Sequence, residues 1–241
     1  MKLSNKNIRK WEQHYLSCMS GRTYEPAINR SFPVLPGADM YKARSENVRE
    51  ETIDLSELDD DIRVFFVSDH HFGHRNIIKY ANRPFSIDDV EESMDEEMIR
   101  RHNSVVSYND IVFFLGDIAF CNTDRANSII ERLNGYKILI IGNHDWNKNK
   151  TLKGYVVDET HVSYTLQSSG YDGDILLTHA PFYSHLMLTP GLLNLHGHIH
   201  TKTVGFANFV NLCVEHIGYT PVMLEDVLRM HRTGSQLNRK L

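Results

Sequence analysis

The sequence has few cysteines, no long hydrophobic run and no excess of positive charge. Its three cysteines, Cys18, Cys121 and Cys213, are far apart and form no Cys-x-x-Cys pair, so we expect free thiols in a reducing compartment. No apolar stretch approaches the roughly 20 residues of a membrane-spanning helix. Residues 1–11 lack the apolar segment of a signal peptide. These absences predict a cytoplasmic protein without a membrane partner, in the host cytoplasm if a phage encodes it.

The charge balance disfavours a nucleic-acid partner. The net charge is -5 at pH 7 with histidine neutral, so the chain offers no basic field to a nucleic-acid backbone. With 241 residues, 41% hydrophobic and 24% charged, it fits one sizeable domain or one domain with an extension. Fourteen histidines are many for this length, and several of them follow apolar runs.

From residue 62 the sequence alternates between apolar runs and amphipathic stretches. Runs at 63–68, 111–115 and 136–141 are predicted strands, and the stretches between them are predicted helices that begin at Ser86 and Thr123. The second half is rich in strands, predicted at 161–166, 175–178 and 209–214, before a last helix at 224–231. This order favours two sheets partly covered by helices over a single doubly wound sheet.

Residues 1–60 carry no motif and are predicted to be an N-terminal extension of a domain at 61–241. Residues 5–19 have helical spacing of apolar side chains, and 23–37 contain three prolines and little periodicity. The extension is interpreted as a packing arm, an oligomer arm or a cap over the active site, so a homo-oligomer is one of the alternatives.

Side chains able to bind metal ions follow the apolar runs, often beside glycine. They are Asp69, His71, Asp117, Asn143, His144, His179, His198 and His200. Nitrogen and oxygen ligands without cysteine suit Mn, Fe, Ni or Zn. Each motif alone is weak, and a lone histidine such as His179 is usually a hydrogen-bonded core residue. The whole set is large enough for two ions, which together can activate water and hold both oxygens of a displacement.

The ordered set resembles the calcineurin-like metallophosphoesterase superfamily over about residues 62–225. The matching motifs are Asp69-x-His71, Gly116-Asp117, Gly142-Asn143-His144-Asp145, His179 and Gly197-His198-x-His200. The flanking residues 72–78 and 82–85 are similar to a small bacterial and phage branch of phosphoesterases. The resemblance implies an α/β (α+β) fold, a four-layer αββα sandwich of two mixed sheets flanked by helices, with a dinuclear site at the strand ends.

The resemblance also implies a role for each motif residue. It assigns Asp69, His71 and His200 to one metal, Asn143, His179 and His198 to the other, and a bridging position to Asp117. The implied cofactors are two divalent ions, Mn first with Fe, Ni or Zn as alternatives, whose bridging hydroxide attacks phosphorus in line. His144 is implied as general acid or charge stabiliser beside the leaving group, and Asp145 as the residue that orients it.

The substrate is expected to be a small phosphodiester or nucleotide, such as a cyclic nucleotide. Asp117 is followed by Ile118-Ala119-Phe120 and not by the Asp-Arg-Gly of the superfamily's protein phosphatases, which disfavours a phosphoprotein. The candidate substrate contacts are His74, Arg75, Asn76, Arg83 and His185. Arg75 and Arg83 are alternatively surface cations, and His185 a solvated side chain. Two other functions stay open: a nuclease of the same superfamily and a non-catalytic metal-binding module.

Overall fold

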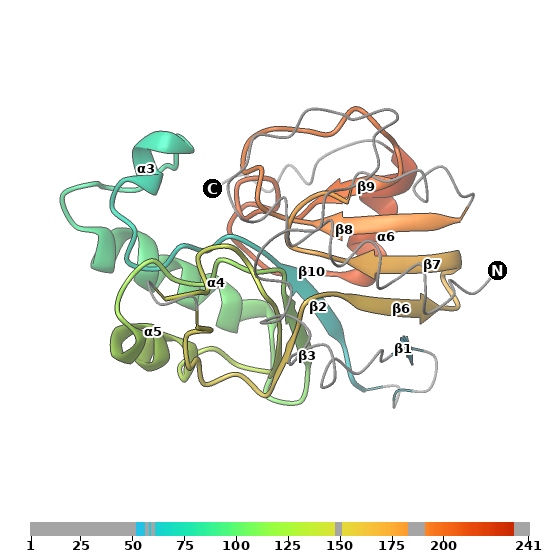
Figure 1. Ribbon diagram of the computed structural model, residues 1–241, viewed down its shortest axis with the longest axis horizontal. Helices are drawn as coiled ribbons and strands as arrows, with labels where there is room; N and C mark the ends of the chain where they lie inside the picture. The colour runs from blue at the N-terminus through green and yellow to red at the C-terminus, as the bar shows by residue number, and fades with distance from the viewer. Residues whose placement is uncertain (1–51, 56–57, 59–60, 148–150, 183–190, 234–241) are drawn as a thin grey trace, which may run out of the picture. The chain divides into compact units, whose positions relative to one another are not determined.

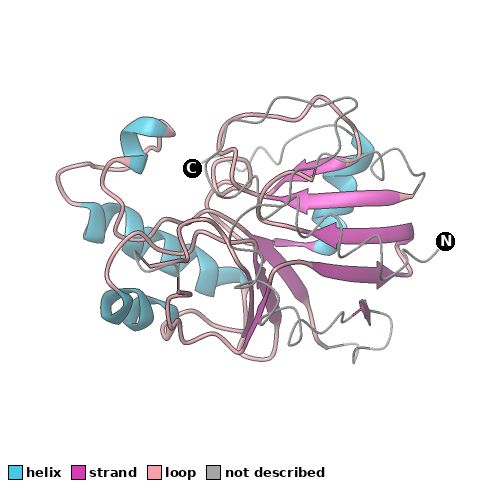
Figure 2. Cartoon of the chain, viewed as in Figure 1, coloured by secondary structure: helices cyan, strands magenta, loops and turns pink. Residues whose placement is uncertain are grey.

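Two five-stranded mixed sheets form the centre of the part of the chain that the structure describes (Figures 1 and 2). The computed structural model describes residues 52–55, 58, 61–147, 151–182 and 191–233. The predicted helix at 5–19, the loop at 23–37 and His185 lie outside these residues. The described residues belong to one compact unit, Thr52–Leu241. Two mixed sheets with helices confirm the predicted fold class.

The first sheet contains the predicted alternation of strands and helices. Its strand order is β10-β2-β3-β4-β5, with β2, β3, β4 and β5 parallel and β10 antiparallel. The strands are β2 (Val64–Val67), β3 (Ile111–Phe114), β4 (Tyr136–Ile140), β5 (Glu159–His161) and β10 (Val222–Met223). The helices between them are α3 (Ile77–Tyr80), η2 (Glu91–Asp95), α4 (Glu96–Val105) and α5 (Thr123–Ile130). Because β2, β3 and β4 are parallel, their carboxyl ends meet at one edge.

The second sheet has the order β1-β6-β7-β8-β9, in which only β6 and β7 pair antiparallel. Its strands are β1 (Thr52–Asp54), β6 (Tyr164–Ser168), β7 (Tyr171–Leu177), β8 (Leu192–His196) and β9 (Phe209–Asn211). The last helix, α6 (Leu224–Thr233), contacts β2 and β10 of one sheet and β9 of the other. Strand β1 falls in the segment predicted as an extension, yet it pairs with β6.

The core explains why the central strands are uniformly apolar. Every residue of β2 is buried, and the Phe66 ring stacks on that of Phe113 in β3, with centroids 5.5 Å apart. A strand covered on both faces has no polar side to alternate with. Met94 of η2 and Met98 and Ile99 of α4 are buried, so one face of this helical segment packs on the core. No helix among the described residues is long and apolar enough to cross a membrane.

Three local predictions are wrong. The run at 161–166 is divided between β5 of one sheet and β6 of the other, because alternation does not specify which neighbour a strand pairs with. Ser86 does not cap the helical run: its hydroxyl accepts from the Asp88 amide, while Asp89 accepts from the Glu92 amide at 3.1 Å. The cap of α5 is Asn122 and not Thr123, since Asn122 accepts from the Arg125 amide at 2.9 Å.

Protonation of His102 is expected to make the fold less stable in acid. Burial in α4 holds the pKa of His102 at about 4, below the ordinary 6.5. The unfolded chain therefore binds a proton that the folded chain excludes, and stability falls as the pH drops from 6.5 towards 4. We expect a loss of about 2 kcal/mol between pH 7 and pH 5 from this group. Denaturant unfolding of His102→Gln should show a shallower pH dependence, and equal slopes would contradict the assignment.

Candidate metal centre

The candidate ligands occupy loops at the carboxyl ends of five strands. Asp69 and His71 follow β2, Asp117 follows β3, Asn143 follows β4, His179 follows β7, and His198 and His200 follow β8. Backbone hydrogen bonds join these loops, from the Asp69 amide to the Gly116 carbonyl (3.1 Å) and from the Gly197 amide to the His179 carbonyl (2.7 Å). Parallel strands thus bring together residues that are up to 131 positions apart, from Asp69 to His200.

The structure gathers the ligands into two neighbouring clusters. One contains Asp69, His71 and His200, and the other contains Asp117, His179 and His198, with the ligand atoms of each cluster within 4.8 Å of one another. Asp117 Oδ2 lies 3.6 Å from His71 Nε2 and 3.4 Å from His179 Nε2, so this carboxylate stands between the clusters. Asn143 Oδ1 lies 3.0 Å from His179 Nε2 and joins the second cluster.

Polar atoms of the first cluster are buried without a hydrogen-bond partner among the described residues: Asp69 Oδ1 and both ring nitrogens of His71. Asp69 Oδ1 and His71 Nε2 lie 3.7 Å apart. A buried polar atom left unpaired costs about 1–3 kcal/mol. A divalent cation between them would satisfy both atoms, and the absence of a thiolate from the two clusters suits a cation that prefers nitrogen and oxygen. The residues present therefore fit a metal ion.

Backbone strain is concentrated at the same residues. Seven non-glycine residues of the described chain have positive φ, and five of them are predicted ligands. These five are Asp69 (60°), His71 (53°), Asp117 (54°), His198 (70°) and His200 (47°). Left-handed conformations of such residues cost free energy and persist where the surrounding structure imposes them, commonly at functional sites. The strained backbone of these loops therefore accompanies the placement of the five side chains in the two ligand clusters.

Gly116 shows how closely the ligand loops approach one another. It has φ +91°, and a Cβ at this position would lie 2.5 Å from His179 Nδ1 and 2.7 Å from the Gly142 nitrogen. Both distances are shorter than real Cβ contacts, and both neighbours are held in the site. Glycine is therefore required here for the loops after β3, β4 and β7 to meet.

The carboxylates of the site control the charge of His179. The His179 Nδ1–H donates to the Leu115 carbonyl at 2.7 Å, which leaves Nε2 facing Asp117. Burial lowers the pKa of His179, but Asp117 and Asp69 outweigh it and raise this pKa above its usual value. A proton on His179 then partly neutralises the two carboxylates, and a bound divalent cation would replace that proton.

Asp145 has a different role from the predicted one. Its carboxylate is fully buried, with Oδ2 accepting from the Gly142 and Asp117 amides at 2.7 and 2.9 Å and Oδ1 from the Ile118 amide at 3.2 Å. The prediction that Asp145 orients the His144 ring is wrong, because the turn from Gly142 directs its carboxylate towards backbone. Asp145 ties the loop after β3 to the loop after β4.

His144 lies at the rim of the first cluster. Its amide donates to Asp117 Oδ1 at 2.8 Å, and its ring packs against His71 and Phe120, with centroids 5.3 and 5.0 Å away. Burial lowers the pKa of His144, although the nearby Asp117 acts in the opposite direction. The ring is therefore neutral near pH 7 and can donate one hydrogen bond.

Arg83 is neither a substrate contact nor a surface cation. It is 4% exposed and donates to the carbonyls of Asp69 (2.7 Å) and His70 (2.6 Å) and to Glu215 Oε1 (2.9 Å). The sequence interpretations of Arg83 are thus corrected: it stabilises the backbone of the first ligand loop. The sequence around Arg83 does not reveal this role, because its carboxylate partner Glu215 lies 132 residues away.

Glu215 is a site residue that the sequence prediction missed. Its Oε1 lies 3.2 Å from His200 Nδ1, so a proton shared there leaves His200 Nε2 facing Asp69. Burial opposes a charge on Glu215, but Arg83 and His200 together lower its pKa. The available signal was its position straight after the predicted strand at 209–214, since the other site residues also follow predicted strands.

The remaining candidates lie outside the two clusters. The His74 ring stacks on Phe120, and Arg75 is exposed and lies 3.5 Å from Asp88. Asn76 precedes α3 without a capping side-chain hydrogen bond. Cys121 and Cys213 are free thiols, as predicted, and Cys213 Sγ donates to Asp69 Oδ2 at 3.2 Å. Cys18 lies outside the described residues.

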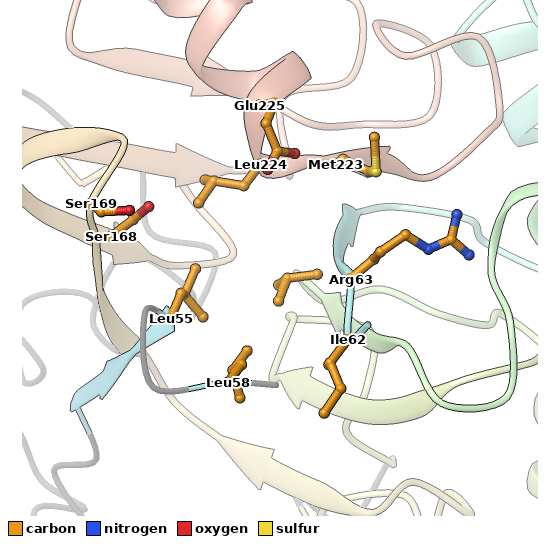
Figure 3. Close-up of a pocket in the computed structure, with 10 residues that line it drawn as sticks. Leu55, Leu58, Ile62, Arg63, Ser168, Ser169, Met223, Leu224 and Glu225 are labelled. Carbon is orange, nitrogen blue, oxygen red and sulfur yellow. The ribbon is translucent and has the colours of Figure 1, made fainter. Parts of the chain in front are cut away.

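A separate cavity of about 260 Å³ lies near the amino end of β2, away from the ligands (Figure 3). Arg63 and Val64 line it where β2 begins, whereas Asp69 follows the end of that strand. Its other lining residues are Leu55, Leu58, Ile62, Ser168, Ser169, Met223, Leu224 and Glu225. None of the candidate ligands takes part in this lining.

Comparison with known proteins places the chain among relatives. It is 34% identical over 181 residues to an uncharacterized protein of Methanocaldococcus jannaschii, covering 71% of this chain and 93% of that protein. The chain belongs to the family of this archaeal protein. The gene 66 protein of Mycobacterium phage L5 is 30% identical over 167 residues, which cover 58% of this chain and 79% of the phage protein. No protein-family model matches the chain.

The family's fold also has a counterpart among solved structures. The crystal structure of a protein of unknown function from Aquifex aeolicus is similar with a TM-score of 0.55 and 25% identity, over 70% of this chain and 100% of that one. None of the three names states an activity.

Proposed function

We propose that the chain is a phosphoesterase that depends on two divalent metal ions and hydrolyses a phosphodiester or nucleotide-type substrate. The observation that carries the proposal is the position of Asp117, whose carboxylate lies 3.6 and 3.4 Å from one histidine of each cluster. A carboxylate shared by two adjacent ligand clusters is suited to a pair of ions. The motif resemblance to metallophosphoesterases supports the same reading.

Each ligand cluster would hold one ion. Asp69, His71 and His200 would bind the first, Asn143, His179 and His198 the second, and Asp117 would contact both. Bound there, the two ions supply Lewis acidity and an activated water for in-line displacement at phosphorus. Mn²⁺ is the first choice among cations that accept imidazole and carboxylate, with Fe, Ni and Zn as alternatives.

The chain's own residues position the metal ligands and stabilise the negative charge that develops on the leaving oxygen. His144 stands at the rim, where its neutral imidazole can donate a hydrogen bond to the leaving oxygen as negative charge develops there. Glu215 and Arg83 orient His200, and Asp145 holds the loops after β3 and β4 in register. No serine, cysteine or other side-chain nucleophile is needed for this reaction.

Hydrolysis of bis-p-nitrophenyl phosphate tests the proposal. We expect turnover with Mn²⁺, its loss on chelation and its return when Mn²⁺ is restored. Metal analysis of the purified protein should find two ions per chain. Bound metal without hydrolysis of mono- or diesters across Mn, Fe, Ni and Zn would favour the non-catalytic module. Digestion of single- or double-stranded DNA at a comparable rate would favour the nuclease.

A further inference from the structure

We propose that Phe120 and His74 form a stacking platform for a nucleobase, so that the substrate is a nucleoside phosphodiester. This inference rests on the proposed phosphoesterase function. Phe120 is the third residue after Asp117. It belongs to the segment Ile118-Ala119-Phe120, which stands where the superfamily's protein phosphatases have Asp-Arg-Gly. The platform gives this segment a role in substrate binding.

An aromatic rim, made of His74, Tyr80 and Phe120, lies beside the candidate metal centre. The Phe120 ring is stacked on His74 with centroids 4.2 Å apart and planes at 27°, and Tyr80 packs edge-on against His74 at 6.3 Å. Phe120 is 45% exposed and Tyr80 76% exposed. The Phe120 ring also meets the ring of His144 at 5.0 Å, and the His74 ring lies 5.5 Å from that of His71, so the rim borders the first ligand cluster.

The backbone holds Phe120 in place. Its amide donates to the Phe72 carbonyl at 2.9 Å, and the Phe72 amide donates to the Ile118 carbonyl at 3.0 Å. These bonds form a short parallel bridge between the loops after β2 and β3. The Ala119 carbonyl also accepts from Lys153 Nζ at 3.1 Å and from the Tyr155 hydroxyl at 3.2 Å. A preordered aromatic ring loses little entropy when a ligand stacks on it.

A nucleobase is the flat group that best fits this position. Its π face can stack on phenylalanine irrespective of base identity, and the diester that it carries would extend towards the ligand clusters. The net charge of -5 disfavours a long polyanion and is compatible with a small nucleotide substrate. A half-exposed phenylalanine at the rim has no comparable use for a small aliphatic phosphate ester.

Two substrates with the same leaving group test the platform. Thymidine 5′-p-nitrophenyl phosphate carries a nucleoside, and methyl p-nitrophenyl phosphate carries none. We expect the parent protein with Mn²⁺ to prefer the thymidine ester in kcat/KM. Phe120→Ala should reduce this preference about tenfold or more, and Phe120→Trp should restore it. Tyr108→Ala is the matched control, because Tyr108 is 83% exposed and precedes β3 at the opposite end from Phe120.

The outcomes separate this inference from the function on which it rests. Hydrolysis of neither ester by the parent would overturn the proposed function. Hydrolysis of both without preference, or a preference that survives Phe120→Ala in a folded variant, would overturn the platform and leave the phosphoesterase intact. Thymidine monophosphate and a short oligothymidylate are also tested as inhibitors, and inhibition that is weaker for Phe120→Ala than for the parent supports the platform. Comparing the two inhibitors distinguishes a free nucleotide from a strand end as the ligand.

Discussion

Replacing Asp117 with asparagine is expected to lower kcat/KM for bis-p-nitrophenyl phosphate by about a thousandfold. Asp117 is the carboxylate that stands between the two clusters, 3.6 Å from His71 Nε2 and 3.4 Å from His179 Nε2. Asparagine keeps the shape and one oxygen ligand but removes the negative charge that would hold two cations together. A thousandfold loss corresponds to about 4 kcal/mol of transition-state stabilisation, within the range that metal ions supply.

The measurement combines steady-state kinetics with metal analysis. Asp117→Asn should bind fewer ions per chain while its circular dichroism stays that of the parent. Asp124→Asn is the matched control, since Asp124 is exposed in the first turn of α5 and should leave both readouts unchanged. Full activity in a folded Asp117→Asn protein would refute the bridging role.

Replacing His144 with alanine is expected to lower kcat by about a hundredfold to a thousandfold without loss of metal. His144 belongs to neither ligand cluster, and its ring packs at the rim against His71 and Phe120. If it stabilises charge on the leaving oxygen, the defect should be larger for phenyl esters than for p-nitrophenyl esters. A p-nitrophenolate carries its own charge well and depends less on the hydrogen bond.

A leaving-group series with metal content measured in parallel checks this role. His231→Ala is the control, because His231 lies on α6 and pairs with the Ala207 carbonyl. A His144→Ala defect that is equal for good and poor leaving groups would contradict leaving-group stabilisation. Loss of a metal ion would instead indicate that His144 acts as a ligand.

The predicted strands β2, β3 and β4 and the amphipathic helices between them agree with the structure because their signals are local. A buried parallel strand is an uninterrupted apolar run, and an amphipathic helix repeats its apolar residues every three or four positions. The set of candidate metal ligands could be predicted from the sequence for a related reason. A polar group beside glycine directly after an apolar run falls at the carboxyl edge of a parallel sheet.

The sequence by itself determined which side chains gather at the carboxyl edge, because strand ends and their glycines are encoded by neighbouring residues. Only the tertiary structure decided what supports them. Arg83 is buried against Glu215, 132 residues away, and Asp145 binds the amides of Asp117 and Ile118 across two loops. Hydrogen-bond partners so distant leave no periodic or local signal in the sequence. Arg83 was therefore predicted to be a substrate contact or a surface cation, and Asp145 to orient His144.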